Sequence, residues 1–298
     1  MFSSFPTRYI VLLPRLLFSS LAIGLVYSQS VYADTVSHQP NIAVTASNDV
    51  NIYVAHALSA PKQLQLHYSS SVRVNQILAD TIVNIEQIPT DKIAVNASLY
   101  WPASALYTQK NADEIEQLQY SVLKQLDLIK QTNSNEAERK ALDNLALWIE
   151  SLPAKKKLLS GLDYDAVRVN SNMNPLINQN MLLVLPTRPK HVTVVGAVVG
   201  EFFSNTNDTR IWSIQPWTSR YSARDYLANI RVFDDSENSF SWVIQPDGNI
   251  EKHPIAYWNF KHMDLAAGAL IYMPFTSLPK GAKSLNEDML ALLRNSAL

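Results

Sequence analysis

The chain has 298 residues, 25 basic and 26 acidic side chains, a formal net charge of −1 at pH 7 and a hydrophobic content of 47%. Without a long basic tract, this charge balance argues against nucleic-acid binding by electrostatics. The sequence contains no Cys, which excludes disulfides, thiolate catalysis and Cys-ligated zinc. The length favours two domains, and the hydrophobic content suffices to bury a core.

The first 33 residues have the pattern of a secretory signal peptide. Arg8 and Arg15 are the only charged residues before Asp34, and residues 16–26 are apolar apart from two Ser. The segment ends in Ala33, as expected of a signal-peptidase site. The alternative is an uncleaved membrane anchor, but a spanning helix needs about 20 apolar residues and this run is shorter. We therefore expect an exported protein whose signal peptide is cleaved.

The region from Ile42 to Tyr100 is mostly strand-like. Residues 51–54 and 64–68 alternate between apolar and polar side chains with a period of two. Residues 72–82 allow one short amphipathic helix.

Between Asn111 and Leu152 the apolar period becomes helical. Two stripes are separated by the polar residues 131–134, and Pro153 ends the second stripe. Two helices joined by a short polar break predict an αα-hairpin. A helical insertion in a β-rich chain suggests a specific role, which we interpret as docking.

Arg139 precedes Leu142, Ala146 and Ile149 at helical spacing. A charge on an apolar stripe usually lies at its edge, with the charged head in water. The alternative is that Arg139 meets a carboxylate across a contact between the hairpin and the second domain. Arg139 is therefore a candidate interdomain salt-bridge residue.

Three lysines, Lys155 to Lys157, follow the hairpin. Lysines just after a helix end commonly form a solvated cap that the helix dipole favours. We expect that arrangement here, with a specific anion site as the alternative.

The second β-rich region begins with a strand at residues 191–200, whose weak alternation suggests burial on both faces. Ser222 and Asp225 then have the spacing of a helix cap before a short helix. The order of strand, Ser-bearing turn and short helix echoes the first region, which hints at two copies of one domain. The chain ends in an amphipathic helix. We expect it to pack on its own domain, with insertion into a membrane or a partner as the alternative.

The segment from Gln245 to Asn249 reads as a turn. Pro246 presets φ, and Asp247 and Gly248 tolerate the remaining turn conformations. Asp247 is therefore interpreted as a turn residue rather than a catalytic carboxylate. Pro254 restricts the following strand to an edge or a bulge.

No catalytic or metal-binding motif stands out. His253, His262 and Asp264 are close in sequence but lack metal-ligand spacing, and no G-x-S-x-G or H-E-x-x-H motif occurs. Glycan hydrolysis requires two carboxylates across a cleft, and the adjacent Asp234 and Asp235 lie in a polar, loop-like run. We predict no catalytic residue, no metal and no cofactor.

Aromatic residues crowd the second region. Trp and Tyr rings pack in cores, anchor protein interfaces and stack on sugars. Core packing is the expected role for most of them, and partner or glycan contact is the alternative for this set: Trp212, Trp217, Tyr221, Trp242, Tyr257 and Trp258.

Several of these stretches resemble one family. They are WVIQPDG from Trp242, AYWN from Ala256, GALIYMPF from Gly268, VTVVGAV from Val192 and LYWP from Leu99. Together with the terminal LNEDMLALLR, they are similar to the GfcC-type capsule (exopolysaccharide) biosynthesis family of Gram-negative bacteria. The resemblance covers nearly all of the chain after the signal peptide.

The resemblance implies an α+β fold of tandem β-grasp (ubiquitin-like) domains. The first would span residues 34–190 and carry the helical-hairpin insert at about 103–152, which leans on the second domain at 191–283. A C-terminal amphipathic helix at 284–298 would pack back on the second domain. The arrangement is similar to part of the Wza-type polysaccharide export channel, whose domains are SLBB-like.

The family association implies a non-enzymatic periplasmic accessory of capsule or exopolysaccharide assembly or export. Its partners would be export or assembly proteins of the envelope, and the mature chain would have no membrane span. The alternatives are a polysaccharide-binding module that uses the aromatics of the second domain, and a polysaccharide-modifying enzyme.

Overall fold

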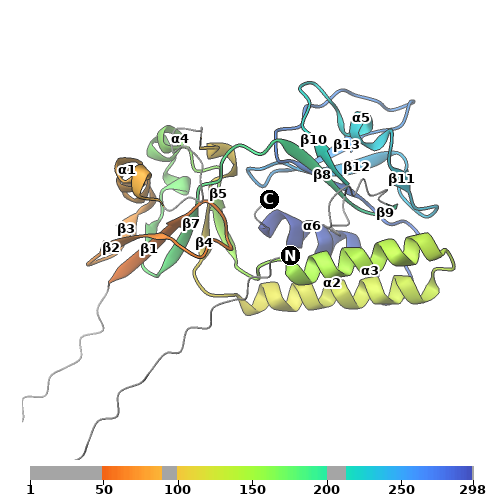
Figure 1. Ribbon diagram of the computed structural model, residues 1–298, viewed down its shortest axis with the longest axis horizontal. Helices are drawn as coiled ribbons and strands as arrows, with labels where there is room; N and C mark the ends of the chain where they lie inside the picture. The colour runs from red at the N-terminus through yellow and green to blue at the C-terminus, as the bar shows by residue number, and fades with distance from the viewer. Residues whose placement is uncertain (1–48, 89–98, 200–212, 297–298) are drawn as a thin grey trace, which may run out of the picture. The chain divides into compact units, whose positions relative to one another are not determined.

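Two five-stranded sheets organise the protein (Figure 1). The structure is a computed structural model that describes residues 49–88, 99–199 and 213–296. In the first sheet the strand order is β2-β1-β7-β4-β5. The strands are β1 (Val50–Ala55), β2 (Leu64–Tyr68), β4 (Ala105–Thr108), β5 (Lys157–Ser160) and β7 (Met181–Val184).

The second sheet has the order β10-β8-β14-β12-β13. Its strands are β8 (His191–Gly196), β10 (Ser213–Pro216), β12 (Phe240–Ile244), β13 (Ile250–Pro254) and β14 (Leu270–Met273). In each sheet the first strand pairs antiparallel with the second and parallel with the last. The third strand lies beside the last and pairs with the fourth, which forms the outer edge. Both sheets therefore have the same topology.

Short elements complete each sheet. The described residues form six α-helices, so the fold is mixed α+β. One short helix follows the second strand of each sheet: α1 (Val74–Val83) in the first and α5 (Ala223–Leu227) in the second. The capping box predicted from Ser222 and Asp225 is present at the start of α5. The other small elements are β3 (Val72–Arg73), β6 (Leu176–Ile177), β9 (Val198–Val199), β11 (Arg231–Val232), α4 (Tyr164–Val169) and the 3₁₀ turns at Ile85–Gln87, Trp101–Ala103 and Ser171–Met173.

A helical hairpin is inserted between the neighbouring strands β4 and β5. It consists of α2 (Asp113–Thr132) and α3 (Glu136–Ser151), which run antiparallel (Figure 1). The Asn135 side chain caps α3 by accepting hydrogen bonds from two backbone N–H groups. Lys130 forms an ion pair with Asp143 across the two helices. The hairpin predicted from the change in apolar period is confirmed.

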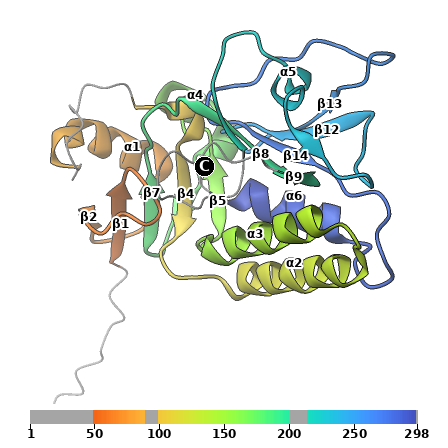
Figure 2. The ribbon, with the colours of Figure 1, turned by 45° about the vertical axis from the view of Figure 1, so that its right-hand side comes forward.

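The C-terminal helix α6 (Leu285–Asn295) lies between the hairpin and the second sheet (Figure 2). Its stripe of Leu285, Met289, Leu292 and Leu293 is buried in a core that also includes buried residues of α2, α3, β8 and β14. Gln125 and Ser121 of α2 both donate to the Asp288 carboxylate, at 2.7 and 3.1 Å. This helix therefore packs on the protein, as expected, and its carboxylate ties it to the hairpin.

The first sheet has a core of its own. Val50, Ile52 and Val54 of β1 point to one face, where they pack against Ile77 and Leu78 of α1. A smaller apolar cluster that includes Tyr107 and Leu182 covers the other face. The two sheets thus share a topology but bury their faces against different elements.

Candidate functional site

The second region places its predicted aromatic residues in very different environments. Trp217 donates its ring N–H to the Leu265 carbonyl oxygen at 2.9 Å, and the Arg188 guanidinium lies 4.9 Å from its ring centroid. These contacts fix Trp217 as part of the fold. Tyr221 is 44% exposed and packs edge-on against the buried Tyr226. Trp212 lies outside the described residues.

Trp242 is half-buried in the second sheet, on strand β12. Its ring meets the ring of Phe240, two residues earlier on the same face of the strand, at a centroid distance of 5.8 Å and an angle of 86°. Lys252 of the edge strand β13 is directly opposite Trp242. Trp242 thus belongs to a mixed aromatic and cationic face at the edge of this sheet.

The most exposed aromatic pair is Tyr257 and Trp258, in the loop that follows β13. Their exposed fractions are 81% and 61%, and their rings meet edge-to-face at 5.0 Å. Phe260 in the same loop is 42% exposed and lies 5.1 Å from the Arg224 guanidinium of α5. We call residues 256–261 the aromatic loop.

Asn259 holds the aromatic loop in one conformation. Its side-chain oxygen accepts from the Ala256 backbone N–H at 3.1 Å, and its side-chain nitrogen donates to the Ser239 carbonyl oxygen at 2.8 Å. The backbone N–H of Ile255 donates to the same carbonyl at 3.1 Å. These bonds tie the loop to the start of β12 and point to a fixed display of Tyr257 and Trp258.

A surface groove of about 430 Å³ runs beside the aromatic loop. Phe240 and Lys252 form part of its wall, and the Lys252 ammonium is 3.6 Å from the centroid of the Phe240 ring. We call it the aromatic groove; its lining is Glu237, Ser239, Phe240, Lys252, Pro254 and Asn259.

Sequence reasoning found Trp242, Tyr257 and Trp258 but missed Phe240, Lys252, Asn259 and Phe260. Phe residues are typical core residues, so the sequence gives no reason to place Phe240 or Phe260 at the surface. Alternation along β12 gives no signal either, because Phe240 and Trp242 are half-buried while the polar Ser241 between them is fully buried.

The charged residue that α3 buries is Glu138, not Arg139. Arg139 is exposed and forms no ion pair with any residue that the structure describes. Glu138 is 4% exposed and accepts hydrogen bonds from the Asp234 backbone N–H at 3.1 Å and from Asn133 at 2.7 Å. Glu138 lies on the buried stripe of α3, because it precedes the buried residues Leu142, Leu145 and Ile149 by four, seven and eleven positions. The exposed position of Arg139 agrees with the edge arrangement that is usual for such a charge, and the charge that faces Asp234 is that of Glu138, one residue earlier.

The three lysines after the hairpin have separate partners and do not form a common solvated cap. Lys155 donates to the Gln109 carbonyl oxygen, and Lys156 pairs with Glu114 at 2.6 Å. Lys157 lies on strand β5 and donates to the Arg294 and Ser296 carbonyl oxygens, both at 2.8 Å. It therefore caps the C-terminus of α6. Burial, together with the nearby Arg294 and against the opposing effect of Asp247, lowers the pKa of Lys157 to about 8.

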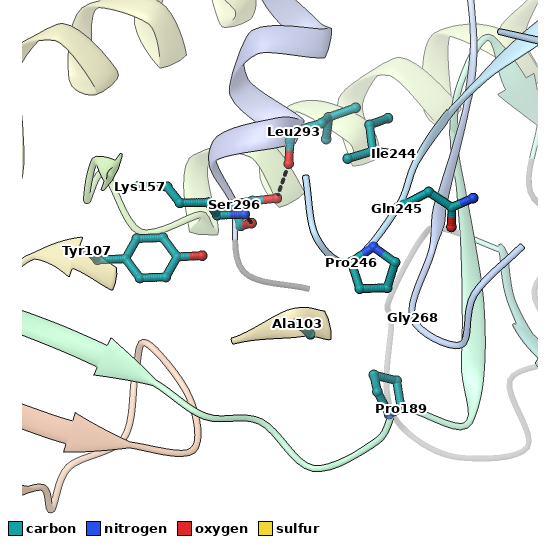
Figure 3. A pocket seen from close by; sticks show the side chains of 10 residues that line it. All are labelled: Ala103, Tyr107, Lys157, Pro189, Ile244, Gln245, Pro246, Gly268, Leu293 and Ser296. Atoms are coloured by element: carbon teal, nitrogen blue, oxygen red, sulfur yellow. Dashed lines mark hydrogen bonds between the residues drawn. The ribbon is translucent and has the colours of Figure 1, made fainter. Parts of the chain in front are cut away.

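Figure 3 shows the cavity beside Lys157, between Tyr107, Pro246 and the end of α6. Its volume of about 10 Å³ is no more than one water requires. The predicted turn at Gln245–Asn249 lies here, with Gly248 at a φ of +85°. Ser160 of β5 donates to the Asp247 carbonyl oxygen at 2.5 Å. Asp247 is thus a turn residue that fixes structure, and this cavity is too small for a ligand.

The remaining polar clusters have structural partners. His253 is buried, and its Nε2 lies 2.9 Å from a Glu251 oxygen, which Gln245 also contacts at 2.9 Å. His262 pairs with Asp264 at 3.1 Å at the surface. Within the described ranges, no group of three or more His, Asp or Glu side chains is arranged to hold a metal ion. The same ranges contain no helix that is long and apolar enough to span a bilayer.

Comparison with known proteins identifies the family. Residues 56–187 match the N-terminal model of the capsule biosynthesis protein GfcC, and residues 212–297 match its C-terminal model. Together these ranges cover more than two thirds of the chain. The chain is also 26% identical over 199 residues to the uncharacterized protein YjbG of Escherichia coli strain K12, covering 66% of this chain and 76% of that protein. The chain belongs to the GfcC capsule-biosynthesis family.

Proposed function

We propose that this protein is a non-enzymatic periplasmic accessory of capsule or exopolysaccharide assembly or export. The match to both family models is the observation that carries the proposal, because both models are named for capsule biosynthesis. The signal-peptide pattern of residues 1–33 supports an exported location.

We further infer that the two sheets belong to tandem β-grasp domains. The support is their shared strand order, with the first and last strands parallel at the centre and a helix after the first strand pair. The first domain would contain the hairpin insert, and the hairpin and α6 would both pack on the second.

The non-enzymatic part of the proposal rests on the geometry of the polar groups. Glu138, Asp234 and Asp235 line one pocket beside the hairpin. Glu138 accepts hydrogen bonds from the Asp234 backbone N–H and from Asn133, and Asp235 accepts one from Ser277. These bonds within the fold disfavour Glu138 and Asp235 as the acid and base that a glycosidase places across a cleft.

The protein would act through contacts with export or assembly proteins of the envelope. Exposed aromatic side chains favour such contacts, because Trp and Tyr are enriched at binding hot spots. The same side chains favour a second candidate function, direct polysaccharide binding, because Tyr257 and Trp258 are exposed on a loop whose Asn259 lines an open groove.

Polysaccharide partition in a deletion strain tests the proposal. The amount of surface-attached polymer is compared with the polymer retained in the cell and released to the medium, in the wild-type, deletion and complemented strains. We expect surface polymer to fall and retained or released polymer to rise, with recovery on complementation. An unchanged amount and location of polymer would contradict a role in assembly or export.

A further inference from the structure

We propose that the aromatic groove and the adjoining aromatic loop bind a segment of a carboxylate-bearing polysaccharide. The choice of a polysaccharide over other ligand classes rests on the proposed function. The choice of an acidic polysaccharide over a neutral one rests on the charges at the groove.

The rings supply a stacking surface of the kind that sugars use. Tyr257 and Trp258 expose 81% and 61% of their surface, which is costly in water unless a partner covers them. Their edge-to-face contact and the three hydrogen bonds that anchor the loop through Asn259 and the Ser239 carbonyl limit their freedom. A ring that is already ordered loses little conformational entropy on binding. The loop is thus preorganised to receive a flat apolar sugar face.

Hydrogen-bonding groups line the groove, which shares Asn259 with the aromatic loop. One carboxylate oxygen of Glu237 accepts from the backbone N–H groups of Asn238 and Ser239, at 3.0 and 2.7 Å. These bonds fix the carboxylate, and its second oxygen has no hydrogen bond from any described residue. A fixed, open acceptor of this kind suits a sugar hydroxyl. Small-molecule sites commonly combine apolar walls with a few such polar groups.

Lys252 in the groove wall is joined by two further cations at the aromatic loop, against one lining acid, Glu237. The exposed Lys252 lies over the Phe240 ring. Neither Lys252 nor Lys261, an exposed residue of the aromatic loop, forms an ion pair within the described ranges. Arg224 lies over Phe260 at the far side of the loop. These cations favour a carboxylate on the ligand.

Three acidic groups near the groove have partners of their own. Asp264 is paired with His262, and the Asp225 carboxylate accepts from Ser222 at the start of α5. Glu251 contacts the buried His253, and alternation along β13 directs it to the opposite face from Lys252. Glu237 is the acid that lines the groove itself.

The size and openness of the groove fit a polymer segment. Its volume of about 430 Å³ lies within the range of about 300–1,000 Å³ that is typical of small-molecule sites. Its lining includes Lys252 and Pro254 of the edge strand β13 and Asn259 of the aromatic loop, and it is open to solvent. A chain can therefore enter and leave it without threading through the protein.

Direct titration tests the inference. The probes are oligogalacturonate and hyaluronan oligosaccharides, which carry carboxylates, and dextran oligosaccharides of similar length, which are neutral. Isothermal titration calorimetry gives Kd, and intrinsic Trp fluorescence provides a second readout for the wild-type protein. We expect at least one acidic probe to bind at least tenfold more tightly than dextran. Its affinity should fall as NaCl rises, because salt screens exposed charges.

Two variants and two matched controls locate the site. The double variant Tyr257→Ala/Trp258→Ala should weaken acidic-probe binding at least tenfold, and Lys252→Met should weaken it threefold or more and reduce the preference over dextran. Tyr120→Ala removes a 70% exposed aromatic ring of α2, and Lys140→Met removes an exposed charge of α3. Both controls should bind as the wild type does. All four changes are at exposed residues, so thermal unfolding should confirm intact folds.

Three outcomes would overturn the inference: no binding of either acidic probe, equal binding of dextran, or an equal loss of affinity in the control variants. None of them bears on the deletion phenotype. If the deletion changes polymer partition but the protein binds no acidic probe, the binding site is contradicted, and the proposed function through protein contacts is retained. Probe binding with an unchanged partition would instead contradict the assembly role and retain the binding site.

Discussion

The two sheets have one topology but differ in where they carry aromatic side chains. Around the first sheet, the exposed large apolar residues are aliphatic, such as Val83 and Val169. Around the second, they include four aromatic residues: Tyr221, Tyr257, Trp258 and Phe260. Because the scaffold is the same, the aromatic surface does not follow from the strand order. Three of the four, Tyr257, Trp258 and Phe260, lie in the aromatic loop after the edge strand β13. A binding function is therefore assigned to this loop rather than to the fold.

The largest expected difference between the sheets lies at the end of their first strands. Gly196 of β8 pairs with Met273, and Ala55 of β1 pairs with Val184 at the equivalent position. Gly196 has a φ of +103°, and an added Cβ would lie 2.3 Å from the Met273 carbonyl oxygen. Gly196→Ala should therefore lower the free energy of unfolding by more than about 3 kcal/mol, or prevent folding, since strain and a backbone clash add. Chemical denaturation measures the effect.

The reciprocal change in the first sheet is the control. Ala55 is fully buried in a regular strand, so Ala55→Gly should cost only about 0.5–1 kcal/mol through backbone entropy, together with a lost methyl contact. Equal effects of the two substitutions would contradict the view that only the second sheet needs a left-handed backbone at this point.

A second difference is that the helical hairpin joins the core of the second sheet through a buried carboxylate. Glu138→Ala would leave the Asp234 N–H and the Asn133 amide without their acceptor. A fully buried group without a partner costs about 1–3 kcal/mol. Both donors are only part-buried, so we expect a total loss of about 1–2 kcal/mol in urea denaturation. Arg139→Ala, at the adjacent exposed position, should change stability by less than about 0.5 kcal/mol. A larger effect for Arg139 than for Glu138 would restore the original salt-bridge hypothesis.

The Glu138 result shows what a periodic sequence can and cannot determine. The apolar stripes were sufficient to predict α2, α3 and α6, because helical spacing is a local property. They did not determine which of two adjacent charges faces the partner, because spacings of three and four residues are both compatible with a stripe. The partner atom is also a backbone N–H of Asp234, and a backbone group leaves no trace in the sequence.

The candidate site was predictable to a similar extent. Tyr257 and Trp258 were recognised as aromatic residues, but core packing was the expected role of such residues. Their exposure depends on the Asn259 bonds to Ala256 and Ser239, which involve the backbone and a strand pairing that is remote in sequence. The turn at Asp247 was predictable because its chemistry is contained within five residues.

Lys157 makes the stability of the protein depend on pH, because its half-buried amine joins β5 of the first sheet to the C-terminus of α6. Its pKa is about 8 in the folded protein and about 10.5 when unfolded. Between these values the unfolded chain binds more protons, so stability should rise with pH relative to a variant without this amine. We expect wild type to gain about 1–2 kcal/mol over Lys157→Met between pH 7.5 and about 10.5, allowing for partial solvent screening.

Urea denaturation of both proteins across this range measures the difference, in which contributions from other groups cancel. Lys140→Met is the control for removal of a positive charge, and its difference from wild type should stay constant. A constant difference for Lys157→Met as well would contradict burial of the amine at the end of α6.

The smallest effect is expected from a substitution that makes one position of the second sheet resemble the equivalent position of the first. Matching the strand pairs of the two sheets places Ser241 of β12 at the position of Ala105 in β4, and both are buried. The Ser241 hydroxyl has no hydrogen-bond partner among the described residues, and a buried hydroxyl without a partner is destabilising. Ser241→Ala should therefore leave the free energy of unfolding unchanged or raise it by up to about 1 kcal/mol, as thermal and urea unfolding would show. A loss of more than about 1 kcal/mol would mean that the hydroxyl is satisfied in solution, and that this position requires a polar side chain that the first sheet does without.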